Sequence, residues 1–158
     1  MGIDISPSMA GVTVRAARAA DYDRIAAVVD DWWGRPVRQV LPRLFLDHFH
    51  DTSFVADDSE GLAGFLAGFL SPSLREVAYI HFAGVAPRMR GHGLARLLYE
   101  RFFDLAEADG RHLVRAITAP VNAGSIAFHA ALGFAVDGPV PGYDGPSSAK
   151  MVFERELG

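Results

Sequence analysis

The residues best suited to chemistry lie between Val85 and Arg96, where a predicted strand ends and a predicted helix begins. Gly91 and Gly93 remove side chains at the helix start, so bare backbone N–H groups and the positive end of the helix dipole form an anion site. A phosphate-bearing ligand accounts for this arrangement, and the alternative is an ordinary turn before a helix. The cationic side chains around the two glycines are Arg88, Arg90, His92 and Arg96.

Two common phosphate-binding motifs do not fit this segment. A P-loop needs Gly-Lys-Ser/Thr after its loop, which the segment lacks. The dinucleotide-binding fingerprint needs a third small residue where Arg96 stands, and it follows the first strand of a fold instead of one in the middle of the chain. We therefore expect the segment to bind its phosphate-bearing ligand through a different motif.

The segment resembles a signature of the Gcn5-related N-acetyltransferases, the GNAT superfamily. The run 90–95, Arg-Gly-His-Gly-Leu-Ala, fits the pattern Gln/Arg-x-x-Gly-x-Gly/Ala, and a Val-x-Pro lead-in at 85–87 precedes it. Asn122 and the run 127–134, Ala-Phe-His-x-x-Leu-Gly-Phe, also match, with His129 where the family often has Tyr. Arg15 and Asp21 match the usual opening of such domains, so the likeness covers nearly the whole chain.

The resemblance implies a fold and a reaction. The fold would be one α/β (α+β) domain over 12–158, with a mixed, mostly antiparallel sheet, flanking helices and two strands splayed at the acetyl-CoA site. The reaction would be acetyl transfer from acetyl-CoA to an amine, by direct attack in a ternary complex and without a metal. The backbone of 82–85 would bind the acetyl and pantetheine groups, and the motif would hold the pyrophosphate. The implied cofactor-binding residues are Phe82, Gly84, Val85, Arg88, Arg90, Gly91, His92, Gly93, Leu94, Ala95, Arg96, Asn122, Ser125 and Phe128.

Three side chains are candidates for proton transfer in such a reaction. His129 stands where the family places a residue facing the departing sulfur, and the alternative is a structural histidine. Tyr79 and His81 share one face of their strand, so either could deprotonate the amine directly or through water. The alternative for Tyr79 is packing against a helix. The family often has Glu in this strand and here only Glu76 precedes it, which leaves the general base open.

The acceptor pocket is expected at the end of the first helix, because this region covers the acceptor in the family. Aromatic rings beside carboxylates suit a cationic amine through cation–π and ion-pair contacts. The alternative is that one Trp is core and the aspartates are solvated. The predicted substrate-binding residues are Asp30, Asp31, Trp32, Trp33 and, from a late loop, Tyr143.

Apolar periodicity predicts the elements that must position these residues. A helix capped by Asp21 is expected, and Gly34 and Pro36 are expected to end it. One face of this helix carries Ile25, Val28, Val29, Trp32 and Trp33. Residues 62–70 are apolar on both faces, which predicts a strand covered on both sides. Further helices are expected at 41–49, 94–108 and 126–132, further strands at 12–16, 53–56, 77–85, 112–119, 134–136 and 149–157, a turn at 57–61 and a loop at 137–148.

Composition limits the class of protein. The 158 residues are 50% hydrophobic and include no cysteine, which excludes a disulfide framework, a Cys-bound zinc and a thiol nucleophile. The net charge of −4 argues against nucleic acid as a partner, and the apolar stretch 61–70 is too short to span a membrane. Residues 1–11 lack the features of a signal peptide and are expected to be disordered, so we predict a cytoplasmic protein. Strand 149–157 is expected at a sheet edge, which predicts a homodimer.

Other functions stay open at this stage. Without an obvious Glu base, the domain could bind acyl-CoA without turnover and act as a sensor. The acceptor could be a protein N-terminus or lysine, and Ala83 and Gly84 do not exclude a longer acyl group. We favour a small-molecule amine as the acceptor, because no feature of the sequence resembles a long peptide-binding groove.

Overall fold

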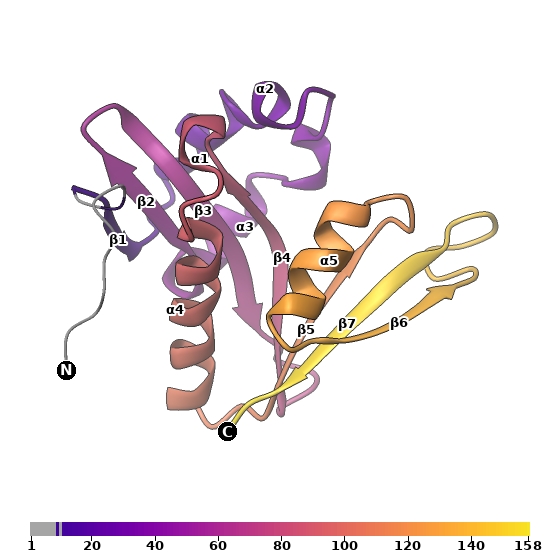
Figure 1. Cartoon of the computed structure of the whole chain (residues 1–158). Helices are drawn as coiled ribbons and strands as arrows, with labels where there is room; N and C mark the ends of the chain where they lie inside the picture. The colour runs from indigo at the N-terminus through magenta and orange to yellow at the C-terminus, as the bar shows by residue number, and fades with distance from the viewer. Residues whose placement is uncertain (1–8, 10) are drawn as a thin grey trace. The chain divides into compact units, whose positions relative to one another are not determined.

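Seven strands and the helices α1 to α5 make up the fold in a computed structural model that describes residues 9 and 11–158 (Figure 1). The strands are β1 (Thr13–Ala16), β2 (Phe54–Asp58), β3 (Gly61–Leu70), β4 (Val77–Val85), β5 (Leu113–Thr118), β6 (Ala135–Val140) and β7 (Lys150–Glu156). The helices are α1 (Asp21–Ala26), α2 (Val29–Trp33), α3 (Leu44–Phe49), α4 (Leu94–Ala108) and α5 (Ala123–Ala131). The disorder predicted for residues 1–11 falls outside the described residues, apart from Met9 and Gly11.

The strands form one mixed sheet, in which hydrogen-bonded neighbours follow the order β1-β2-β3-β4-β5-β7-β6. β2 is antiparallel to β1 and β3, and β7 is antiparallel to β5 and β6. β4 and β5 are parallel, with partners running from Val77–Leu113 to Tyr79–Arg115. The predicted fold class, a mixed and mostly antiparallel sheet with flanking helices, is confirmed.

Contacts within the chain group its residues into two units. Unit 1 consists of Met1–Phe69 and Phe82–Phe102, and unit 2 consists of Leu70–His81 and Phe103–Gly158. Unit 1 carries the glycine motif and the acceptor residues predicted on the first helix. Unit 2 carries all three candidates for proton transfer. The predicted site residues are therefore distributed over both units.

The core of unit 1 lies along β3, both faces of which are buried as predicted. Phe65 and Leu66 are at most 1% exposed. Gly64 lets α4 approach β3, because an added Cβ would stand 3.2 Å from Leu94 Cδ2 and 3.3 Å from Leu98 Cδ1. Full burial of such apolar side chains contributes about 1.5–3 kcal/mol each. This packing fixes the beginning of α4 against the sheet of unit 1.

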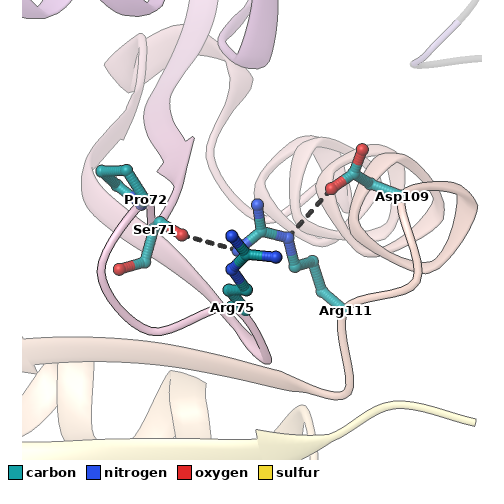
Figure 2. A pocket seen from close by; sticks show the side chains of 5 residues that line it. All are labelled: Ser71, Pro72, Arg75, Asp109 and Arg111. Atoms are coloured by element: carbon teal, nitrogen blue, oxygen red, sulfur yellow. Dashed lines mark hydrogen bonds and ion pairs between the residues drawn. The ribbon is translucent and has the colours of Figure 1, made fainter.

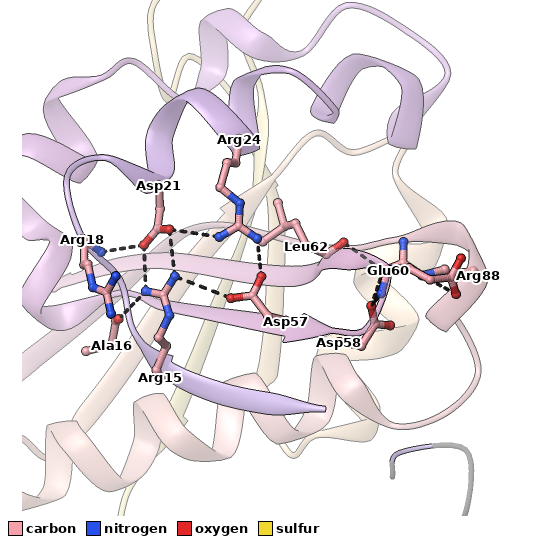
Figure 3. A network of polar contacts seen from close by, with 10 residues as sticks. All are labelled: Arg15, Ala16, Arg18, Asp21, Arg24, Asp57, Asp58, Glu60, Leu62 and Arg88. Carbon is pink, nitrogen blue, oxygen red and sulfur yellow. Dashed lines mark hydrogen bonds and ion pairs between the residues drawn. The ribbon is translucent and has the colours of Figure 1, made fainter. Parts of the chain in front are cut away.

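The helix predicted from Asp21 is two short helices, α1 and α2, with a turn at 27–28 between them. Asp21 does not cap α1, since the capping position is Ala20 and no side chain bonds there. The buried Asp21 carboxylate instead accepts hydrogen bonds from the Arg15 guanidinium at 2.9 Å and from the Arg18 N–H at 2.7 Å (Figure 3). Asp21 thus connects α1 to β1, and both of its carboxylate oxygens accept hydrogen bonds from that side. Of the predicted helix face, Ile25, Val29 and Trp32 are buried, whereas Val28 and Trp33 are only partly buried.

The turn between β2 and β3 is shorter than predicted. Asp57 and Asp58 belong to β2, and only Ser59–Glu60 form the turn. The Asp57 carboxylate pairs with Arg15 at 3.5 Å and with Arg24 (Figure 3). Cationic partners from β1 and α1 therefore allow a carboxylate to stand inside the strand.

In unit 2, β7 lies between β5 and β6, so the prediction that 149–157 is an edge strand is wrong. β6 is the outer strand, and it extends into the segment 137–148 that was expected to be a loop. Gly138 and Pro139 are unusual in strands, which is why the sequence predicted a loop here. An outer strand tolerates Pro at a position whose backbone N–H is not needed for pairing. The pairing of β6 with β7 also shifts register between Asp137 and Val140.

Helix α5 has a defined beginning and end. The Asn122 Oδ1 accepts a hydrogen bond from the Ser125 N–H at 3.2 Å and so caps the helix. Gly133, with φ of +86°, follows the helix and ends it. Across residues 9 and 11–158, no helix is both long and apolar enough to cross a membrane.

Candidate functional site

The glycine motif forms an open turn directly before α4. Gly91 and Gly93 have φ of +80° and +85°, and an added Cβ at either would meet nothing within 4 Å. The Gly93 carbonyl accepts the Leu97 N–H at 3.0 Å, which makes Gly93 the residue before the first helical turn. The N–H groups of that turn have no acceptor inside the helix. The geometry is that of a backbone anion site with room for a ligand.

Two of the predicted cationic contacts are engaged within unit 1. The Arg88 guanidinium pairs with Asp58 at 2.8 Å and with Glu60 at 3.5 Å (Figure 3). The Arg90 guanidinium donates to the Trp32 carbonyl, which lies in the last turn of α2. Both arginines thus fix the motif loop to neighbouring elements. All four basic side chains of the motif, His92 and Arg96 included, are exposed.

The predicted acetyl-binding stretch of β4 contacts α2 on one face. The Phe82 ring centroid lies 4.7 Å from that of Trp33 and 5.8 Å from that of Phe65. At Gly84 an added Cβ would stand 2.5 Å from Trp33 Cη2 and 2.9 Å from Phe65 Cε1. Glycine is needed at 84 for space. The structure therefore brings Trp33 together with Phe82 and Gly84, a contact for which the sequence held no signal beyond a glycine within a strand.

The predicted acceptor residues of α2 divide into two kinds. Asp30 Oδ1 accepts hydrogen bonds from the Val37 N–H at 2.8 Å and the Arg38 N–H at 2.9 Å, so it orders the loop after α2. Trp32 is buried in the core, which agrees with the alternative that one of the two tryptophans is a core residue. Asp31 is exposed and Trp33 is partly exposed. These two are the side chains of the set that a ligand can reach in unit 1.

His129 lies in the core of unit 2 and is 5% exposed. Its ring stacks on Phe153 with centroids 4.1 Å apart, and Phe134 packs edge-on at 5.0 Å. Nδ1 lies 2.7 Å from the Ser125 carbonyl oxygen, so Nδ1 carries the proton and donates it. Burial lowers the pKa of His129, partly offset by the bond to Ser125. These are the contacts of a neutral structural histidine, the alternative that the sequence left open.

The three residues predicted to bind the cofactor arm in unit 2 also have internal contacts. Asn122 Nδ2 donates to Thr118 Oγ1 at 3.2 Å in addition to its capping bond. The Ser125 hydroxyl oxygen lies 3.3 Å from His129 Nδ1. The Phe128 ring meets His129 edge-on at 5.5 Å. A cofactor contact of these residues stays a prediction.

Tyr79 is brought together with the late loop of unit 2. Burial, together with the nearby Tyr143 and Asp144, raises the pKa of Tyr79 to about 12. The phenol therefore keeps its proton at neutral pH, which suits a hydrogen-bond donor better than a base. The His81 ring centroid lies 6.1 Å from that of Tyr79. Tyr143 is 46% exposed, and its neighbour Asp144 pairs with Lys150 at 3.0 Å.

No cluster of three or more His, Cys, Asp or Glu side chains that could hold a metal ion occurs in the part of the chain that the structure describes.

The mixed seven-stranded sheet and the glycine turn before α4 define an α/β fold with an open backbone turn at a helix start. A profile of the acetyltransferase (GNAT) family matches residues 20–134, most of the chain. The chain belongs to this family, which confirms the resemblance found in the runs 90–95 and 127–134.

Relatives of known name point to one enzyme type. The L-2,4-diaminobutyric acid acetyltransferase of Chromohalobacter salexigens is 29% identical over 124 residues, covering 71% of this chain and 65% of that protein. Four further relatives carry the same name. The matches span 30% to 65% of the length of these five proteins.

Crystal structures share the fold. A protein described as a GNAT-family acetyltransferase from Desulfovibrio desulfuricans superposes with a TM-score of 0.80 at 19% identity, covering 93% of this chain and 99% of that one. The diaminobutyrate acetyltransferase of Paenibacillus lautus, in complex with L-2,4-diaminobutyric acid and coenzyme A, gives a TM-score of 0.71 at 20% identity, with 90% and 93% covered. At these identities the likeness concerns the fold alone.

Proposed function

We propose that the protein transfers an acetyl group from acetyl-CoA to a primary amine of a small molecule. One observation carries the proposal: in a member of the acetyltransferase (GNAT) family, Gly91 and Gly93 form a turn with positive φ and open space at the start of α4. Backbone N–H groups at such a turn suit a pyrophosphate, which needs several donors and close approach of the main chain.

The reaction needs no covalent intermediate on the protein. The neutral amine attacks the thioester carbonyl, a C–N bond forms, the C–S bond breaks and the CoA thiol leaves, while the amine loses a proton. The chain has no cysteine to accept the acetyl group. Direct transfer in a ternary complex is therefore the simplest route.

The proposed hydrogen-bond donor to the leaving sulfur is Tyr79, because a phenol is protonated at neutral pH, and the raised pKa of Tyr79 rules out its use as the base. His129 is neutral, and its Nδ1 proton is committed to the Ser125 carbonyl, which favours a structural role. The amine proton then passes to His81 or to water. His81 stands close to Tyr79 on the same strand.

The acceptor we propose is a small cationic amine. Asp31 is the exposed acidic side chain and Trp33 a partly exposed aromatic one at the end of α2, and each of these residue types suits an ammonium group. Relatives that act on L-2,4-diaminobutyric acid by name support an amino acid with a second amine. Trp33, lying over Gly84, also favours a short acyl group along this part of β4.

Release of free CoA thiol tests the proposal directly. We expect turnover of acetyl-CoA with at least one member of a panel that holds L-2,4-diaminobutyric acid, other diamino acids, polyamines and peptides with free N-termini. Asp31→Asn should raise the KM of the acceptor and leave that of acetyl-CoA unchanged. Acetyl-CoA binding without turnover of any amine would instead support a sensor, and turnover of peptides alone would support a protein acceptor.

We also propose a cytoplasmic homodimer. The absence of a membrane-spanning helix among the described residues supports a protein free of the bilayer. If the chains pair through their sheets, β6 is the strand of unit 2 that has an unpaired side. Sedimentation at high concentration should show a mass above 17.1 kDa.

A further inference from the structure

Unit 2 contains a cavity that takes no part in the functions proposed above. It lies at the turn between β3 and β4 and at the entry to β5, and it has a volume of about 380 Å³. Five residues line it, as Figure 2 shows: Ser71, Pro72, Arg75, Asp109 and Arg111.

Arg111 is held rigidly in this cavity. Its guanidinium donates to the Ser71 carbonyl at 2.7 Å and to the Val77 carbonyl at 3.1 Å, and Nε pairs with Asp109 at 2.9 Å. The side chain is only 14% exposed. These bonds fix the plane of the guanidinium and close the turn between β3 and β4 around it.

The cavity carries excess positive charge. Asp109 is its only carboxylate and is paired with Arg111. Arg75 is exposed and has no carboxylate within 4.0 Å in the part of the chain that the structure describes. The cavity has two guanidinium groups and a single carboxylate. Because the whole chain has a net charge of −4, this local excess of positive charge does not reflect a generally basic protein.

A neutral donor completes the lining. The Ser71 Oγ accepts the Leu74 N–H at 3.0 Å, which leaves its O–H free to donate. Ser71 is 9% exposed, so its position is fixed by the turn. The cavity thus offers the Arg75 guanidinium, the remaining N–H groups of Arg111 and the Ser71 hydroxyl, all of which donate hydrogen bonds.

We propose that this cavity is a binding site for a small oxyanion, the phosphate or carboxylate group of a metabolite. Guanidinium groups bind both kinds of oxyanion with paired N–H···O bonds, and a bound anion would relieve the repulsion between Arg75 and Arg111. The site is separate from the glycine motif in sequence, because its residues lie between β3 and β4 and between α4 and β5, whereas the motif lies between β4 and α4. Binding here does not require acetyl-CoA.

Backbone amide chemical shifts of the full chain test the site. Inorganic phosphate and malate are titrated separately, each against sodium chloride at equal ionic strength. We expect a saturable shift of the amides at 71–75 and 109–111 with at least one of the two anions, and the tighter anion identifies the chemical class. Sodium chloride alone should produce no saturable change.

Arg75→Gln is the decisive variant, since Arg75 makes none of the bonds that hold the turn closed. We expect it to weaken anion binding about tenfold or more, because one charged donor pair is lost. Arg101→Gln, which removes an exposed arginine of α4, is the matched control and should bind as the wild type does. No saturable shift in the wild type, or equal affinity in Arg75→Gln, would overturn the proposal.

Discussion

Trp33 of α2 and Gly84 of β4 approach so closely that no side chain fits between them. A Cβ at residue 84 would stand 2.5 Å from Trp33 Cη2 and 2.7 Å from Cζ3. The indole is rigid and also packs on Phe82, so the overlap cannot be relieved at the end of a flexible chain. This contact seats α2 on the stretch of β4 that we propose to bind the acetyl group.

Gly84→Ala should therefore destabilise the protein. We expect the free energy of unfolding to fall by about 1–3 kcal/mol, the usual cost of overpacking, as measured by urea denaturation. Gly124→Ala is the control, because its Cβ would meet only Asn122 Oδ1 at 4.0 Å inside α5, where alanine is favoured. Adding Trp33→Ala to Gly84→Ala should recover part of the loss. Full stability of Gly84→Ala would mean that α2 moves freely on β4.

Gly93→Asp should abolish acetyl-CoA binding through the bulk and negative charge of the new side chain beside a pyrophosphate. Gly110→Asp is a close control: Gly110 has φ of +79° against +85° at Gly93, and neither has any atom within 4 Å of an added Cβ. Both variants carry the same backbone strain and the same charge. Calorimetric titration with acetyl-CoA should show loss of affinity in Gly93→Asp alone, and equal affinity in both would remove the motif from the proposed site.

The long periodic elements were predictable because burial repeats along them. The bounds of β4 and α4 agree with the predicted 77–85 and 94–108, since each has an apolar face several residues long and a clear end signal. The glycine motif was predictable for a different reason. Its chemistry is carried by the backbone, so the residue types alone identify it.

Tertiary partners decided the elements that the sequence could not predict. Asp21 has the side chain of a helix cap, but Arg15 and the Arg18 N–H occupy its carboxylate instead. β6 contains Gly138 and Pro139, and it becomes a strand because β7 pairs with it. His129 and Trp33 needed the same information, because whether a ring is core or site depends on neighbours distant in sequence.

The burial of His129 makes stability depend on pH. The folded state lowers the pKa of this ring, whereas the unfolded chain has the ordinary value of about 6.5. Between these two values the unfolded state binds a proton that the folded state does not, so stability is full above about pH 6.5 and falls as the pH drops below it. Urea denaturation across this range should show the loss in the wild type.

His129→Phe keeps an aromatic ring against Phe153 and should remove this contribution to the pH slope. His48→Gln, at an exposed position, should keep it. A slope unchanged by His129→Phe would mean that the ring can take up a proton in the folded state. That result would return His129 to the candidates for acid catalysis.

Tyr79→Phe tests the proposed donor to the leaving sulfur. Thiols have a pKa of about 8.5 and leave fairly well without a proton, so we expect kcat to fall only about tenfold while the KM of acetyl-CoA stays unchanged. Because the pKa of Tyr79 is raised to about 12, the wild-type kcat should not decline between pH 8 and about pH 10 through loss of the phenol proton. Tyr143→Phe, at the exposed neighbour, should change the KM of the acceptor instead of kcat. A Tyr79→Phe enzyme with the wild-type kcat would exclude the phenol as donor, and the thiolate would then leave unprotonated or take its proton from water.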